Sequence, residues 1–527
     1  MNADTLQPRN ESCWQLASAD LVAALSERSA YFYETEHVEL LETHISWLFL
    51  TDRYVYKVKK PVRFEYLDFS TLGKRRQACL DEVRLNRRLA PHVYLDIVPI
   101  RQTAHGLIRI GGAGAPVDWA VRMRRLDADK SVDQLILRRQ LTPRHIQQLT
   151  NHLVSFYDRL PPESIRTDQY RAQIEQHVLS NWEDLDQESL DLPRTVVDSV
   201  HQAQLRLLRI EPTLFDNRVL DGRIVEGHGD LRPEHIYFTP SPVVIDCIEF
   251  SRELRTLDVF DELNFLAMEC ERLNAEDVAN QIVNAYLRNS GDQPDKRLGS
   301  FYRAYRACVR AKVAAQRSAQ LQGEEARQSL LVASEYLELA ASESRQLGPP
   351  LLLFVSGISG SGKSTLATEI SESLQVEHFH TDEIRHQLFG KTSASEYDRG
   401  DYQPARRDAV YDEMVRRAES RLRQGLSVVL DGTFLKNKWR DEAIQAAQRA
   451  GARALMVLCD CPPDIARQRI AQRLRAASND SDASPDFPKF QAVTLEPPRE
   501  GMAVCRVDTT TSRQPMLDTV FASLRKS

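Results

Sequence analysis

The sequence predicts two domains of different class, an α+β domain over residues 1–345 and an α/β domain over residues 346–527. Three observations support this division. First, 527 residues exceed what one hydrophobic core usually supports. Second, Gly348-Pro349-Pro350 ends a charged helical stretch, because proline lacks the amide donor and disfavours helix in the residue before it. Third, short apolar runs alternate with helical segments beyond this point, which is typical of a parallel sheet covered on both faces.

The first domain is expected to hold a small sheet-bearing lobe followed by a helical lobe. Its elements in order are two strands within 38–60 around the turn Thr51–Arg53, a basic helix at 71–90, strands near 93–101 and 117–126, and helices over 142–213 and 257–345.

The second domain is expected to hold a five-stranded parallel sheet. The five apolar runs that predict its strands are 351–356, 376–380, 426–430, 454–459 and 503–507. The helical segments between them are 363–374, 404–424, 438–450 and 463–476.

The composition fits an ordinary globular protein, with 42% hydrophobic and 27% charged residues. A formal net charge of -6 gives no general attraction to nucleic acid or to an anionic membrane. No apolar run approaches the length of a membrane span, and acidic residues interrupt the first thirty positions. We therefore expect a cytoplasmic protein without a membrane partner. The oligomeric state is left open.

The stretch "GISGSGKST" fits the pattern G-x-x-x-x-G-K-[ST], with an apolar run before it and a helical segment after it. Backbone amides of such a loop and of the helix N-terminus can surround a phosphate. The residues expected to do so are Gly357, Ile358, Ser359, Gly360, Ser361, Gly362, Lys363, Ser364 and Thr365. Lys363 would reach the β- and γ-phosphates of ATP, and the Ser364 hydroxyl would bind Mg²⁺. The alternative is an ordinary strand-to-helix turn.

Two acids follow neighbouring strands of this domain. Asp431 ends the run "LSVVLD" and is expected to hold Mg²⁺, while Asp382 follows the run "VEHFH". Asp382 could accept a hydroxyl proton, with Arg385 steadying an anionic group, because ligands of open α/β sheets bind beyond the carboxyl strand ends. Helix capping and a turn acid are the alternatives. Further on, Arg467, Arg469, Arg473 and Arg475 could form a lid helix or a solvated basic face.

Residues 350–527 resemble the small P-loop kinases that include gluconate kinase, chloramphenicol phosphotransferase and the polynucleotide 5′-kinases. The motifs that carry the resemblance are Gly357–Ser364, "TDEIR" at 381–385 and "DGTF" at 431–434. The resemblance implies that Asp382 contacts the acceptor hydroxyl, and that "VDTT" at 507–510 matches the last strand and the following loop near the adenine.

A second phosphate-handling pattern lies in the first domain, in "EGHGDLRPEHIYF" at 226–238. Asp230 could accept the proton of an attacking hydroxyl, and His235, five positions later, stands where such loops commonly carry an Asn metal ligand. Asp246 ends the next apolar run and would be the second metal ligand. Upstream, Lys57 in "YVYKVKKP" could contact nucleotide, oriented by Glu82 on the following helix. The alternatives are an ordinary turn at 228–230, and Lys59 or Lys60 in place of Lys57.

These features resemble the aminoglycoside phosphotransferase-like kinases, which implies a protein-kinase-like fold for the first domain. Nearly the whole chain is similar to bacterial two-domain proteins that join such a kinase to a C-terminal P-loop kinase of the AAA, zeta-toxin and gluconate-kinase type. The stretches "HGDLRPEHI" and "DCIEFSRELRTLDVFDELNFL" carry the match. The sequence departs from the pattern in three ways: it has no glycine-rich nucleotide loop, His235 replaces Asn, and Glu262 stands where relatives more often have Asp. Imidazole suits Mn²⁺ better than Mg²⁺, so Mn²⁺ is a candidate metal at this site.

The sequence thus indicates an ATP- and Mg²⁺-dependent phosphotransferase acting on a small-molecule or nucleotide hydroxyl, with the second domain as the surer active site. The acceptor stays open, and nucleic acid is not expected to bind except as a 5′-end substrate. Two alternatives remain. The first domain could be a catalytically silent binding or regulatory module, or the second could be an NTPase switch without an acceptor.

Overall fold

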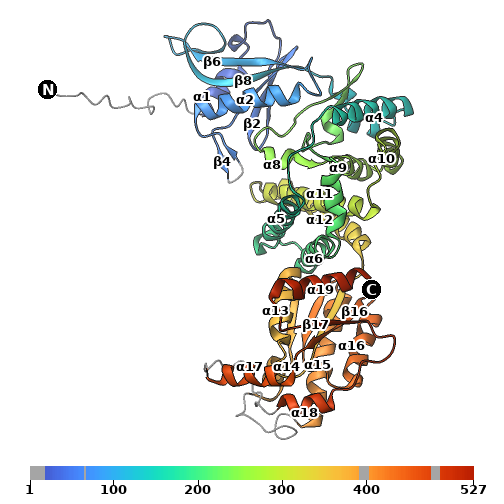
Figure 1. The fold of residues 1–527 in the computed structure, drawn as a ribbon. Helices are drawn as coiled ribbons and strands as arrows, with labels where there is room; N and C mark the ends of the chain where they lie inside the picture. Colours follow the sequence, from blue (N-terminus) through green and yellow to red (C-terminus); the bar gives the residue numbers. More distant parts are fainter. Residues whose placement is uncertain (1–17, 65–66, 391–402, 476–486, 527) are drawn as a thin grey trace, which may run out of the picture. The chain divides into compact units, whose positions relative to one another are not determined.

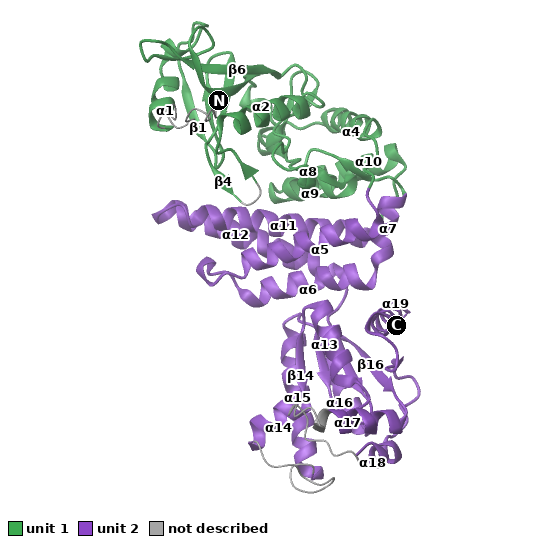
Figure 2. Ribbon diagram, turned by 60° about the vertical axis from the view of Figure 1, so that its left-hand side comes forward, with its two compact units in different colours: residues 1–164, 221–294 green, residues 165–220, 295–527 purple. Residues whose placement is uncertain are grey.

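The computed structural model describes residues 18–64, 67–390, 403–475 and 487–526. The chain forms two compact units, one of residues 1–164 and 221–294 and the other of residues 165–220 and 295–527 (Figure 2). The domain boundary expected near residue 345 stays a prediction. The compact units follow other bounds because helices from the first half of the chain pack with the C-terminal part.

The first unit begins with a six-stranded antiparallel sheet in the order β1-β2-β3-β8-β6-β7. Its strands are β1 (Glu39–Glu42), β2 (Ser46–Leu50), β3 (Tyr54–Lys59), β6 (Tyr94–Gln102), β7 (Ile108–Ile110) and β8 (Ala115–Arg124). The short strands β4 (Arg63–Phe64) and β5 (Leu67–Asp68) form a separate pair. Helix α1 (Ser18–Ser26) precedes the sheet, and helix α2 (Leu72–Asn86) packs against β6 and β8 (Figure 1). The strands and basic helix expected here are all present.

The rest of the first unit is mainly helical. Its helices are α3 (Val132–Leu137), α4 (Pro143–Asp158), α8 (Arg252–Arg255), α9 (Val259–Arg272) and α10 (Glu276–Ser290). Two short antiparallel pairs lie among them, β9 (Ile224–Glu226) with β12 (Thr256–Asp258) and β10 (Ile236–Phe238) with β11 (Pro242–Val244). A buried cluster joins α4, α9 and α10 to the loop after β9, through side chains such as Leu153, Leu231 and Leu266. That cluster fixes the segment that holds Asp230.

The second unit combines five helices with the α/β part of the chain. These helices are α5 (Thr167–Leu185), α6 (Arg194–Ile210), α7 (Pro212–Leu220), α11 (Lys296–Ser318) and α12 (Gly323–Ser344). Within this unit, α6 contacts the start of the second sheet. Buried Arg206 donates to the Gly348 carbonyl at 2.6 Å and to the Ser427 hydroxyl at 3.3 Å, and Ile210 joins an apolar core of that sheet.

The second sheet has five parallel strands in the order β14-β15-β13-β16-β17, which confirms the expected sheet. The strands are β13 (Leu351–Ser356), β14 (Glu377–His380), β15 (Val428–Asp431), β16 (Arg453–Asp460) and β17 (Val504–Asp508). The helices are α13 (Lys363–Leu374), α14 (Thr381–Phe389), α15 (Pro404–Arg423), α16 (Asn437–Arg449), α17 (Pro463–Arg475), α18 (Phe487–Thr494) and α19 (Arg513–Lys526). One face of the sheet packs on α15 and α16, and the other on α13 and α19. Strand alternation explains this double burial.

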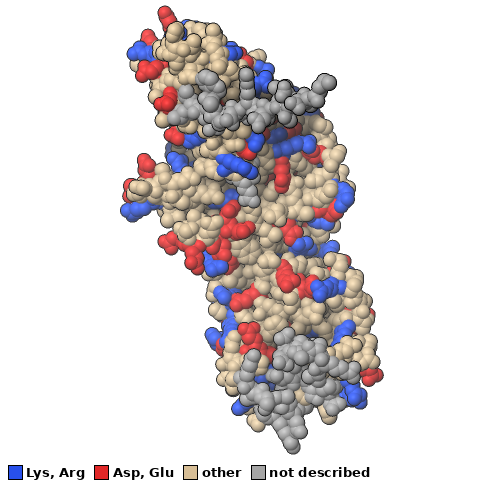
Figure 3. All heavy atoms as spheres, turned by 90° about the vertical axis from the view of Figure 1, so that its left-hand side faces the viewer, with Lys and Arg blue, Asp and Glu red and all other residues tan. Residues whose placement is uncertain are grey.

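Among the described helices, none combines the length and apolar character that a membrane crossing needs. Lys and Arg side chains are interspersed with Asp and Glu over the face shown in Figure 3, as the small net charge leads one to expect.

Candidate functional site

The phosphate loop lies between β13 and α13, where the sequence places it. Gly357, Gly360 and Gly362 adopt φ of 146°, 77° and 90°, in the region that favours glycine. A side chain at Gly360 would also overlap the carbonyl oxygen of Ala466, and one at Gly357 would lie 2.8 Å from the Ser361 hydroxyl. The loop therefore needs glycine for its backbone angles and for its close packing.

Lys363 and Ser364 open α13 and face Asp431. The Lys363 ammonium donates to the carbonyl of Ile358 in its own loop at 2.9 Å, and the residue is 9% exposed. The Asp431 carboxylate is buried at the end of β15, with Ser364 among the groups that lower its pKa. Burial alone would raise the pKa of Asp431, but His380, Lys363 and Ser364 outweigh it and hold the pKa below its usual value. Asp431 is thus an ionised carboxylate beside a hydroxyl, which suits a hard divalent cation such as Mg²⁺.

Asp382 and Arg385 lie on α14, directly after β14. Nη1 of Arg385 is 2.5 Å from Oδ1 of Asp382, and the Asp382 side chain is 34% exposed while that of Arg385 is 8% exposed. The neighbouring strand end is joined to this one, because Nδ1 of His380 lies 2.9 Å from Oδ2 of Asp431. The structure therefore brings Asp382, Asp431 and the phosphate loop to the same edge of the sheet.

Two residues outside the predicted phosphate loop, Gln491 and Thr509, bind the loop directly. The backbone N–H of Ser359 donates to the side-chain oxygen of Gln491 on α18 at 2.6 Å. The Thr509 hydroxyl donates to the Ser361 carbonyl at 2.5 Å, and Arg469 on α17 donates to the Thr509 carbonyl at 2.8 Å. Arg469 is thereby held beside Gly362, whereas the side chains of Arg473 and Arg475 lie outside the described residues.

The first unit gathers the lysine and the acids that the sequence predicts there. Nζ of Lys57 lies 2.8 Å from Oε1 of Glu82 and 2.5 Å from Oδ1 of Asp246. Nζ of Lys59 lies 2.5 Å from Oε2 of the same Glu82 and also pairs with Glu249. Burial alone would lower the pKa of Lys57, but Asp246, Glu82 and Glu249 outweigh it and raise the pKa well above its usual value. Both lysines are therefore cations fixed in a buried carboxylate network.

The carboxylate of Glu262 accepts hydrogen bonds from the backbone of the loop around Asp230. One Glu262 oxygen accepts the backbone N–H of His228 at 2.7 Å and that of Gly229, and the other accepts the Tyr157 hydroxyl at 2.6 Å. A side chain at Gly227 would lie 2.8 Å from the same carboxylate. His228 in turn contacts the Ile245 carbonyl at 2.9 Å, and burial lowers its pKa. Glu262 therefore fixes the conformation of this loop through its hydrogen bonds to the backbone.

His235 lies between Asp230 and Asp246, but Arg232 lies there too. Nδ1 of His235 is 2.9 Å from the Asp230 carbonyl oxygen, so this nitrogen donates and Nε2 accepts from Nη2 of Arg232 at 3.1 Å. Nε2 is also 3.7 Å from Oδ2 of Asp246. Arg232 further pairs with Asp230 at 3.0 Å. A guanidinium therefore contacts the expected base, Asp230, and one of the two expected metal ligands, His235, a contact that the sequence position of Arg232 alone did not determine.

Asp246 itself has φ of 65°, a left-handed backbone that is uncommon outside glycine. Its N–H donates to the Tyr94 hydroxyl at 3.0 Å. Burial alone would raise the pKa of Asp246, but interactions led by the charge of Lys57 outweigh burial and lower the pKa. A strained backbone at a strand end is typical of functional positions.

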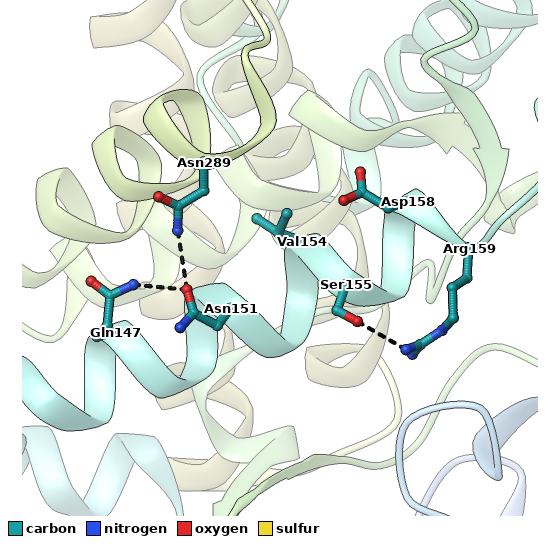
Figure 4. A pocket seen from close by; sticks show the side chains of 7 residues that line it. All are labelled: Gln147, Asn151, Val154, Ser155, Asp158, Arg159 and Asn289. Carbon is teal, nitrogen blue, oxygen red and sulfur yellow. Dashed lines mark hydrogen bonds between the residues drawn. The ribbon is translucent and has the colours of Figure 1, made fainter.

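A surface depression of about 460 Å³ lies elsewhere on the first unit, along α4 and beside Asn289 of α10 (Figure 4). Its polar side chains bond to one another: Gln147 and Asn289 both donate to the Asn151 side chain, at 2.7 and 3.1 Å. The depression shares no residue with either candidate site, and we assign it no role.

The comparisons with known proteins agree with the C-terminal geometry. Residues 352–496 match the model of the AAA_33 family, described as an AAA domain. The phosphate loop, the five-stranded parallel sheet and this match identify a P-loop kinase-like domain.

Over most of its length the chain is similar to mycobacterial proteins. It is 31% identical over 470 residues to the uncharacterized protein Rv2004c of Mycobacterium tuberculosis (strain ATCC 25618 / H37Rv) and to the uncharacterized protein Mb2027c of Mycobacterium bovis, covering 85% of this chain and 88% of each relative. The chain belongs to the family of these proteins.

Solved structures similar to the chain include a gluconokinase from Sinorhizobium meliloti 1021, with 21% identity, 34% of this chain and 93% of that chain covered, and a TM-score of 0.26. Another is the Mycobacterium tuberculosis APS kinase CysC in complex with AMPPNP and APS, with 21% identity, coverage of 34% and 100%, and a TM-score of 0.27.

Proposed function

We propose that the protein is an ATP-dependent phosphotransferase whose P-loop site transfers the γ-phosphoryl group of ATP to the hydroxyl of a small molecule or nucleotide. The observation that carries the proposal is the placement of a partly exposed acid, Asp382, at the sheet edge that also holds the phosphate loop. A nucleotide switch needs the loop and Asp431 but has no use for a second, partly exposed carboxylate at this edge of the sheet.

In this reaction, the Asp382 carboxylate accepts the proton of the acceptor hydroxyl while the hydroxyl oxygen attacks the γ-phosphorus and ADP leaves. Arg385 fixes Asp382 and balances its charge. Lys363 leaves the Ile358 carbonyl and binds the phosphates, which are stronger acceptors. Ser364 and Asp431 supply oxygen ligands that fit Mg²⁺, which would add positive charge against the phosphates.

The experiment is a screen of sugars, nucleotides and aminoglycosides in which ADP release is measured with and without Mg²⁺. We expect one acceptor class to raise ADP release well above the rate with ATP alone, and Asp382→Asn to remove the increase while ATP still binds. If no hydroxyl compound raises ADP release, the NTPase-switch alternative replaces this proposal.

A second candidate function concerns the first unit, which we propose is a regulatory or binding module rather than a second catalyst. Arg232 supports this proposal, because its guanidinium donates to Nε2 of His235, the ring nitrogen that would have to bind a metal. The pair of Lys57 with Asp246 adds to it, since a nucleotide phosphate would have to compete with a carboxylate 2.5 Å away.

A further inference from the structure

The edge strand β14 carries two histidines on one face. His378 and His380 are two residues apart, and strand alternation places both imidazoles on the same side of the sheet. The parallel register pairs His380 with Asp431 on the neighbouring strand, and the intervening Phe379 turns to the opposite face and into the core. The two rings lie close together, with centroids 3.8 Å apart.

Three donor atoms converge at this point. One ligand atom each of His378, His380 and Asp431 lie within 4.8 Å of one another. Two of the residues are already bonded, since Nδ1 of His380 is 2.9 Å from Oδ2 of Asp431. By contrast, Nε2 of His378 is buried and has no hydrogen-bond partner in the described part of the chain. Buried polar atoms almost always have a partner, so this nitrogen needs an explanation.

Two imidazoles and one carboxylate are a donor set for a transition metal. Zn²⁺ binds histidine nitrogen at about 2.0–2.1 Å, which puts tetrahedral donors roughly 3.4 Å apart. To reach that geometry, side-chain rotation has to close the widest donor spacing, which is no more than 4.8 Å, by up to roughly 1.4 Å, and to open the 2.9 Å spacing of His380 and Asp431 by roughly 0.5 Å. Mg²⁺ prefers oxygen and keeps most of its water, so it gains little from two imidazoles.

We propose that His378, His380 and Asp431 form a site for a Zn²⁺-like transition-metal ion, which shares Asp431 with the Mg²⁺ position beside Ser364. The ion replaces the proton between His380 and Asp431 and supplies the missing partner of His378. A fourth position is left for water or for a ligand group, as three protein ligands are typical of open zinc sites.

The shared carboxylate makes the two metals compete. With Zn²⁺ bound, Asp431 is drawn toward β14 and is no longer available beside Ser364. Zn²⁺ therefore inhibits phosphoryl transfer, and this consequence, unlike the binding itself, rests on the proposed function.

The binding test uses the full-length protein with excess Mg²⁺. Zn²⁺ bound is measured by equilibrium dialysis, and Co²⁺ is added as a probe because its visible absorption reports tetrahedral nitrogen and oxygen ligands. Wild type is compared with His378→Gln, His380→Gln and, as a matched control, His105→Gln, which changes an exposed histidine of the first unit.

We expect wild type and His105→Gln to bind one Zn²⁺ equally, with at least about tenfold weaker binding in His378→Gln and His380→Gln. The thermal midpoint without metal checks that each variant folds. Two results would overturn the site: wild type that shows no saturable 1:1 binding of Zn²⁺ or Co²⁺, or a folded His378→Gln with wild-type affinity and Co²⁺ spectrum.

A second measurement separates this proposal from the proposed function. Acceptor-dependent ADP release is followed as Zn²⁺ is added, and His378→Gln should require at least about tenfold more Zn²⁺ for half inhibition. If turnover is inhibited equally in both proteins, the competition at Asp431 is wrong. If neither protein turns over ATP, the proposed function fails while the dialysis result still decides the metal site.

Discussion

The two candidate phosphate sites each contain a buried lysine, and they differ in the groups that contact its ammonium. Lys57 lies between the carboxylates of Glu82 and Asp246, while the ammonium of Lys363 donates to the neutral carbonyl of Ile358. A phosphate displaces a neutral carbonyl more easily than an ionised carboxylate. Both sites contain a lysine, but only in the P-loop site is its charge available to a phosphate. In the first unit, carboxylates of the protein already neutralise the lysine. The difference makes the P-loop site the better candidate for catalysis.

The largest expected effect is that of Lys363→Ala, which tests whether the P-loop site is the catalytic one of the two. If the P-loop site carries the reaction, acceptor-dependent ADP release should fall by about 10³-fold, because the developing phosphate charge loses its cation. Steady-state kinetics measure the loss, and Lys438→Ala, which changes a half-exposed lysine on α16, is the control. Unchanged turnover in Lys363→Ala would move catalysis to the first unit.

Asp382→Asn tests the acceptor side of the same site. The amide keeps the size of the side chain but cannot accept the hydroxyl proton, so transfer should fall by about 10²-fold or more. ATP affinity, measured by calorimetry, should stay close to that of wild type because Asp382 is not part of the phosphate loop. Asp412→Asn, which makes the same change on α15 of the same domain, provides the matched control. Equal loss of ATP affinity and turnover would contradict the assignment.

The metal dependence of the first unit is tested in full-length protein that carries Lys363→Ala, which weakens the contribution of the P-loop site. If Asp246 and His235 bind a metal, nucleotide binding should favour Mn²⁺ over Mg²⁺, and His235→Asn should shift the preference toward Mg²⁺. Asp246→Ala should weaken metal-dependent binding by about tenfold to 100-fold. Nucleotide binding is followed by calorimetry with each metal. Unchanged metal dependence in Asp246→Ala would leave the first unit as a kinase-shaped module without a metal site.

The smallest expected effect concerns Gln491, whose side-chain oxygen accepts the Ser359 N–H of the phosphate loop. Gln491→Ala removes this acceptor and leaves the amide free for phosphate, so ATP affinity should rise by about two- to tenfold, the range of one hydrogen bond. Titration of ATP measures the change, and Gln514→Ala on α19 is the control. Lower ATP affinity in Gln491→Ala would mean that Gln491 supports the nucleotide-bound loop instead of competing for it.

Local patterns in the sequence predicted the five-stranded sheet of the second domain and the strands and helices of the first, while the roles of the residues at both sites stay predictions. The five parallel strands follow from the alternation of apolar runs with helical segments, and the phosphate loop from its glycine pattern, both of which act over a few residues. Contacts between distant segments could not be predicted in this way. Gln491 reaches Ser359 across 132 residues, and Arg232 acts through a side-chain direction that its position alone does not determine.

The contact of α6 with the second sheet has a consequence for synthesis on the ribosome. Arg206 and its partner Ser427 are 221 residues apart, on the order of 10 to 40 s of translation. During that interval residues 221–294 are synthesised and complete the first unit, whereas the strands of the second sheet that α6 contacts have not yet been synthesised. Arg206 and Ile210 therefore lack their final partners while much of the chain is being synthesised. The sheet that carries the phosphate loop can complete its contacts with α6 only near the end of synthesis.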